Sequence, residues 1–164
     1  MEETNMRSAF LLAAMLSVCL FAAGCGSGIG NPLSGGQFDV GLHHISFSHS
    51  VAEWDTTNNR LVLKFDLLSG AKYPYATATV EGVTTIKVDQ ERDVVVQINI
   101  AAGMSYESTP ALPGATAKII FSQFDLGPLG AVSGEINGMA QRIEDSGEAP
   151  VILYATFEDA PVSN

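Results

Sequence analysis

Three histidines, His43, His44 and His49, lie close together in the sequence and raise the question of a metal site. On one extended strand, His43 and His44 point to opposite faces. His49 shares a face with His43, but about 20 Å further along the strand. Side chains that far apart do not bind the same metal ion. We therefore expect no metal site, and we expect these histidines to be exposed or hydrogen-bonded on their strands.

Acidic residues gather in two segments with the composition of turns. They are Asp89, Glu91 and Asp93 in the first segment and Glu144, Asp145 and Glu148 in the second. Calcium prefers oxygen-rich loops, but neither segment has the EF-hand spacing. Arg92 and Arg142 also lie beside these carboxylates. We expect solvated turns here rather than cation sites.

Serine residues do not form a pattern typical of nucleophilic catalysis. The sequence contains no G-x-S-x-G motif, and Ser69-Gly70 and Ser133-Gly134 have the character of turn or strand pairs. No glycine-rich phosphate loop is present, so we expect no cofactor. We predict a protein that is not an enzyme. A hydrolase that combines His43 or His49 with an acid and a hydroxyl is the less favoured alternative.

Two tyrosines give the sequence its candidate ligand-binding residues. Tyr73 and Tyr75 flank Pro74 and share a strand face with Thr77 and Thr79. Exposed rings of this kind stack on pyranose sugars in carbohydrate-binding modules. A tyrosine pair that only covers a sheet has the same sequence pattern. The two interpretations differ in the exposure that they predict for the rings.

Cys25 follows an apolar segment. Residues 9–23 form a run of 15 apolar or weakly polar residues, which is short of the roughly 20 that a membrane-spanning helix needs. The run fits the hydrophobic region of a secretory signal, with Arg7 before it as the positive charge. Two acidic residues precede Met6 and oppose this charge pattern, so Met6 is an alternative translation start.

Residues 21–27 (FAAGCGS) resemble the lipobox of bacterial prolipoproteins, although Ala22 stands where leucine is more common. The resemblance covers only about the first 30 residues. It implies cleavage before Cys25 and attachment of acyl chains such as palmitate to that cysteine, whose thiol is the nucleophile. Two or more chains give stable anchoring. The implied location is the cell envelope, with the outer membrane favoured where the host has one. A cut near Gly24 by ordinary signal peptidase, giving a periplasmic or secreted protein, is the alternative.

Charge and composition limit the classes of partner that we expect for the chain. Its 8 basic and 18 acidic residues give a net charge of −10. Nucleic acids and anionic lipids bind basic surfaces, so we expect neither a nucleic acid partner nor electrostatic docking on lipid. Cys19 lies in the signal segment and Cys25 carries the implied lipid, so the mature domain has no disulfide. The 46% hydrophobic and 16% charged content favours a folded domain.

A period of two residues dominates from Gln37 onward. In 61–67 and 93–101, apolar residues alternate with polar ones, as in antiparallel strands with one buried face. Residues 118–124, 132–138 and 151–157 behave similarly, and 43–49 and 77–88 do so more loosely. Turn residues separate these runs, and Asn58-Asn59 is typical of a tight hairpin. Segments 105–112 and 141–147 leave room for a short helix.

We therefore divide the chain into a signal peptide (1–24), a lipidated cysteine with a Gly/Ser tether (25–36) and one β domain (37–164). The predicted fold is all-β, an antiparallel sandwich of about eight or nine strands, with a β-barrel as the alternative. The predicted function is a binding or structural role at the envelope, with another envelope protein or a polysaccharide as partner. A carbohydrate- or small-ligand-binding module is the alternative within that role.

Overall fold

The computed structural model describes residues 34–163 except Ser69 and Ser146. The predicted signal peptide, Cys25 and the tether as far as residue 33 lie outside the described residues. Within the described part there are ten strands and one 3-10 turn. They are β1 (Gly35–Val40), β2 (His43–Phe47), β3 (His49–Asp55), β4 (Arg60–Asp66), β5 (Tyr75–Glu81), η1 (Val83–Thr85), β6 (Arg92–Ala101), β7 (Met104–Ser108), β8 (Ala117–Phe124), β9 (Ala131–Arg142) and β10 (Val151–Ser163).

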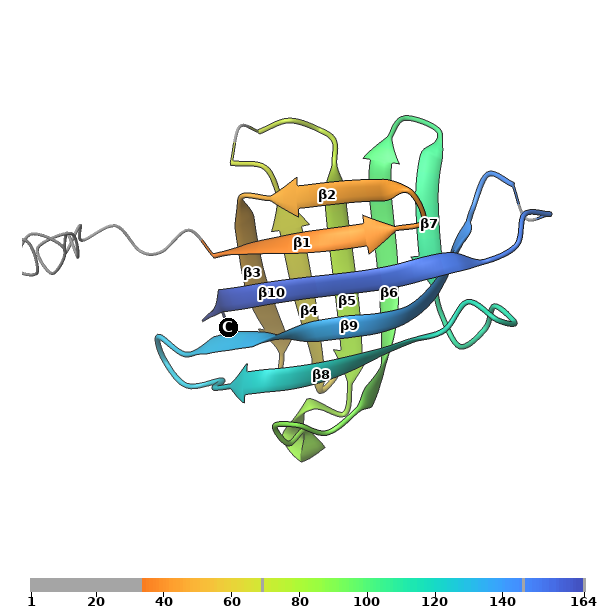
Figure 1. Cartoon of the computed structure of the whole chain (residues 1–164). Coiled ribbons are helices and arrows are strands. Elements are labelled where there is room, and N and C mark those ends of the chain that lie inside the picture. Colours follow the sequence, from red (N-terminus) through yellow and green to blue (C-terminus); the bar gives the residue numbers. More distant parts are fainter. Residues whose placement is uncertain (1–33, 69, 146, 164) are drawn as a thin grey trace, which may run out of the picture. The chain divides into compact units, whose positions relative to one another are not determined.

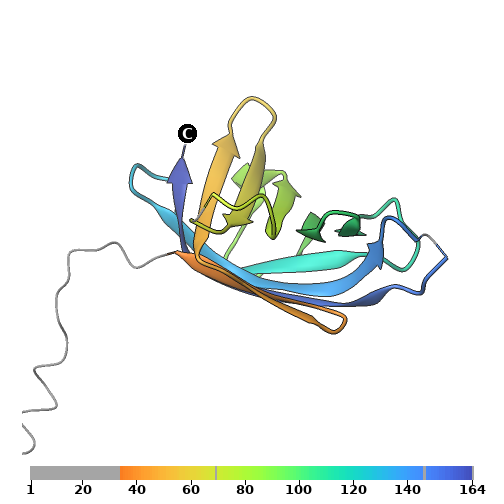
Figure 2. The same ribbon diagram turned by 90° about the horizontal axis from the view of Figure 1, so that it is seen from above.

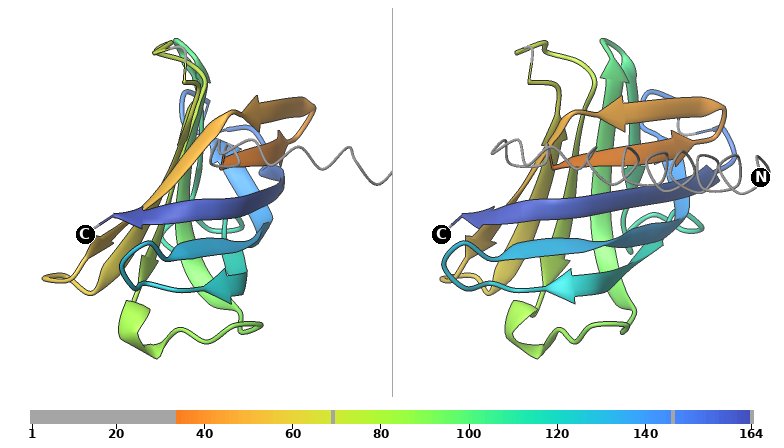
Figure 3. Two further views of the ribbon diagram at one scale, coloured as in Figure 1. Left: turned by 90° about the vertical axis from the view of Figure 1, so that its left-hand side faces the viewer. Right: turned by 60° about the vertical axis from the view of Figure 1, so that its left-hand side comes forward.

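The strands form two layers that cross steeply (Figure 1). The front layer has the order β2-β1-β10-β9-β8, and the back layer has the order β3-β4-β5-β6-β7. Neighbours within each layer are antiparallel. Figure 2 and Figure 3 show the layers facing each other and the front layer curving over the back one.

Three pairings join the layers at their margins. The start of β6 pairs with β8, the end of β9 pairs with β7, and the end of β10 pairs in parallel with β3. These pairings close a barrel of seven strands, with the other strands as additions to it. The all-β prediction is confirmed. Of the two architectures that the sequence left open, the barrel is the one that the strand pairing supports.

The inner faces carry the apolar residues of the alternating runs. Leu61, Leu63 and Phe65 are almost fully buried, as their spacing on β4 predicts. Phe65 contacts the ring of Phe38 at a centroid distance of 4.9 Å and that of Phe157 at 5.9 Å. Aromatic rings therefore fill the barrel interior where β1 and β10 cross β4.

One inner row of the front layer alternates phenylalanine with glycine across five strands. In register, it runs Phe47, Gly36, Phe157, Gly134, Phe121. Each ring has at least one glycine beside it in the row, so it can spread over backbone that carries no side chain. This row packs large rings side by side on a strongly curved sheet.

The structure differs from the predicted elements at four places. The run 43–49 is broken at Ser48, so His43 lies on β2 of the front layer and His49 on β3 of the back layer. Strand β1 begins at Gly35, inside the predicted tether, because Gly35 and Gly36 pair with β10. Residues 105–108 belong to a strand rather than a helix, and the run 77–88 is interrupted by η1.

Candidate functional site

The tyrosines proposed from sequence stack on each other at one end of the back layer. The centroids of Tyr73 and Tyr75 are 6.0 Å apart, with 24° between the ring planes. Tyr75 begins β5 with its side chain on the outer face and is 39% exposed, and Tyr73 is half-buried. Lys72 Nζ lies 5.4 Å from the centroid of Tyr73. The two rings form a partly exposed aromatic surface beside a cation.

Strand register places polar side chains in a row with Tyr75. His49 pairs with Asp66, Tyr75 with Asn99, and Asn99 with Ser105. The pairing of Phe65 with Ala76 puts Asp66 next to Tyr75 in the same register. The row and Tyr73 together are called the tyrosine platform. It spans β3 to β7 on the outer face of the back layer.

Hydrogen bonds hold the polar members of the platform in place. His49 Nδ1 lies 2.9 Å from Asp66 Oδ1, and Ser105 Oγ donates to Asn99 Oδ1 at 2.9 Å. These bonds use one ring nitrogen of His49, one carboxylate oxygen of Asp66 and the carbonyl oxygen of Asn99. The other polar atoms of these side chains are oriented but available to a ligand. The platform thus combines donors and acceptors with an aromatic face.

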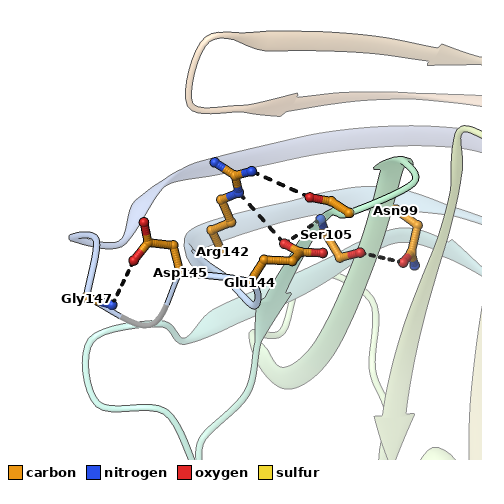
Figure 4. Close-up of polar contacts among 7 residues, drawn as sticks. Asn99, Ser105, Arg142, Glu144, Asp145 and Gly147 are labelled. Atoms are coloured by element: carbon orange, nitrogen blue, oxygen red, sulfur yellow. Dashed lines mark hydrogen bonds and ion pairs between the residues drawn. The ribbon is translucent and has the colours of Figure 1, made fainter.

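The second acidic segment supports the platform at its β7 end (Figure 4). Glu144 Oε2 accepts a hydrogen bond from the Ser105 amide at 3.0 Å and lies 3.7 Å from Arg142 Nε. The Ser105 hydrogen bond, aided by the Arg142 charge, holds the pKa of Glu144 below its usual value. Asp145 Oδ1 accepts from the Gly147 amide. Glu144 thus holds the loop against β7, and Asp145 stabilises the turn within the loop.

In the first acidic segment, Asp93 makes an ion pair with Lys118 at 2.6 Å, between β6 and β8. The hydrogen bond from Lys118 to Asp93 raises the pKa of Lys118. Among the described residues, no group of three or more His, Cys, Asp or Glu side chains is arranged to hold a metal ion.

The three histidines have different surroundings. His44 lies on the outer face of the front layer with Nδ1 2.5 Å from Asp39 Oδ1, and the ring of His43 lies 6.1 Å from that of Tyr106. His49 belongs to the platform. Two rings therefore have a carboxylate partner, and in the described part of the chain no hydroxyl hydrogen-bonds either of them.

Sequence reasoning missed two hollows on the outer face of the front layer. One, of about 350 Å³, lies over β2, β1 and β10, and the other, of about 310 Å³, lies over β10, β9 and β8. Both are lined by Thr156, Phe157 and Glu158, so they adjoin. The sequence predicts a tether at Gly35 and Gly36 and a turn or strand pair at Ser133-Gly134, so it does not bring these segments together.

No family model matches the chain, and no curated protein or solved structure is significantly similar to it. In the described part of the chain, no helix has the length and apolar character needed to cross a membrane.

Proposed function

We propose that the protein is a lipid-anchored cell-envelope protein that binds carbohydrate on the tyrosine platform. The observation that carries this proposal is the exposed Tyr75, stacked with Tyr73 and in register with a hydrogen-bonded polar row. Anchoring through Cys25 rests on the lipobox resemblance. Attachment to the envelope would keep the platform close to surface polysaccharides.

The chemistry of a pyranose matches the platform. The axial C–H groups of a sugar ring pack on an aromatic face, and its hydroxyls need donors and acceptors at the rim. Tyr75 supplies the face, with Tyr73 stacked against it. Asp66 and Asn99, one on each side of Tyr75, supply an acceptor and a donor. Single-ring affinities for such exposed sites are expected near the millimolar range, about −4 kcal/mol.

Saturation-transfer difference NMR tests the platform at that affinity. The purified full chain is mixed with methyl glycosides of glucose, galactose, mannose and N-acetylglucosamine. We expect transfer to the C–H face of at least one sugar, lost in Tyr75→Ala and kept in Tyr75→Phe, which retains the ring. Tyr154→Ala is the matched control, because Tyr154 is also 39% exposed but lies on the front layer. Transfer that survives in Tyr75→Ala, or that no sugar shows, refutes the proposal.

A further inference from the structure

The two hollows on the front layer adjoin over β10 and together extend across the strands. The first is bordered by Gln37 and Ser46, the second by Ser122 and Glu135, and Thr156 and Glu158 line both. We call this the front groove. Five strands lie beneath it, and at about 4.8 Å between strands it extends for roughly 20 Å.

The inner row of alternating rings and glycines lies directly behind this groove. Gly36 and Gly134 flank Phe157 in register, and all three also line the hollows. The register of β10 shifts just after Phe157, and that of β8 shifts just after Phe121. Such bulges bend strands, and they recur next to binding sites. The groove is therefore built into the sheet rather than left by a mobile loop.

The residues that line the front groove indicate which class of extended ligand can bind there. The backbone groups of β1, β10 and β9 are already paired on both sides, so a peptide cannot bind here by adding a strand. The outward side chains offer hydroxyl, amide and carboxylate groups, which hydrogen-bond polyhydroxylated chains. No lysine, arginine or histidine is among the described residues that line either hollow, and Asp89, Glu135 and Glu158 are acidic. An acidic polysaccharide would be repelled.

We propose that the front groove binds a neutral linear glycan that lies across the strands. This site is separate from the tyrosine platform, because the platform lies on the outer face of the back layer. If the proposed function also holds, the protein has two carbohydrate sites on different layers. It would then bridge two glycan chains at the envelope.

Thr156→Trp tests the groove, because Thr156 lines both hollows and a bulky indole at this position should obstruct a ligand that crosses from one to the other. Thr79→Trp is the control, because Thr79 is also half-buried and outward but lies on β5, away from the groove and four residues from Tyr75. The purified full chain is titrated calorimetrically with cellohexaose, chitohexaose, maltohexaose and hexagalacturonate. Thermal melting establishes that both variants are folded.

We expect one neutral hexasaccharide to bind to wild type. Thr156→Trp should bind it with an affinity at least about tenfold lower, which corresponds to the loss of roughly one or two hydrogen bonds. Thr79→Trp should match wild type, and hexagalacturonate should bind only after Glu135→Gln and Glu158→Gln are combined. Unchanged titrations in Thr156→Trp, or no binding of any neutral probe, overturn the groove. Loss in Thr156→Trp with no change in Tyr75→Ala supports the groove as a site of its own, and the platform stands or falls on the saturation-transfer experiment with the methyl glycosides.

Discussion

A Cβ atom built on Gly36 would lie 3.0 Å from Cδ1 of Phe65, so the backbone of β1 rests directly on a core ring of the back layer. Phe65 is 1% exposed and is held by the rings of Phe38, Phe47 and Phe157. The alternation of ring and glycine behind the front groove therefore lets the two layers approach closely where β1 crosses β4.

We predict that Gly36→Ala lowers the free energy of unfolding by about 1–3 kcal/mol, the usual cost of overpacking a core. Gly134→Ala should cost more, because its Cβ would lie 2.3 Å from the Ile120 carbonyl oxygen and backbone must move. Urea unfolding followed by circular dichroism measures both. Gly147→Ala is the control, since its Cβ meets only Asp145 Oδ1 at 3.6 Å. Equal stability of all three variants would contradict this account of the row.

Asn59 has two structural roles in the β3–β4 hairpin, and two substitutions separate them. Its φ of 51° is in the left-handed region, and its side chain bonds the amide and hydroxyl of Thr84 at 3.1 and 3.3 Å. Asn59→Gly removes only the side-chain bonds, which we expect to cost about 1 kcal/mol. Asn59→Ala adds backbone strain of about 1–2 kcal/mol. If alanine proves no worse than glycine in thermal melts, the backbone argument is wrong.

Glu144 should make stability depend on pH. Because its pKa is lowered in the folded state, Glu144 stabilises the fold above the usual glutamate pKa of 4.5, and this stabilisation is lost as pH falls through the folded value. Glu144→Gln should therefore melt at a lower temperature than wild type at about pH 7, and the difference should shrink towards about pH 3. Glu148→Gln serves as the control, since Glu148 lies in the same loop without that network. A difference that stays constant with pH would exclude the charge as its cause.

The sequence predicted the faces of the strands better than their partners. Alternation is a local property, so Leu61, Leu63 and Phe65 could be assigned to the core from spacing alone. The corner at Ser48 and the parallel pairing of Val162 with Ala52 are not local. Nothing in one strand's own residues specifies which strand it meets after the sheet bends, so the sequence is compatible with a barrel and with a sandwich.

In the candidate site, too, the sequence predicts features local to one strand but not contacts between strands. The exposed Tyr75 could be found from its alternation with buried residues, but its neighbours Asp66 and Asn99 come from strands whose register the sequence does not specify. The hydrogen bond from the Ser105 amide to Glu144 joins residues 39 positions apart. The groove was missed because its outward side chains come from five strands whose order and register the sequence does not specify.

The anchor at Cys25 can be tested by the intact mass of the protein isolated from membranes. Wild type should carry the added mass of acyl chains on a chain that begins at Cys25, because the thiol is the group that accepts the lipid. Cys25→Ser should be found unprocessed or released, without that mass. Cys19→Ser is the matched control: Cys19 lies within the cleaved segment, so the mature mass should equal that of wild type. An unlipidated wild-type product cut at another bond would refute the anchor, and the glycan partners of both sites would then be sought among soluble or periplasmic carbohydrates.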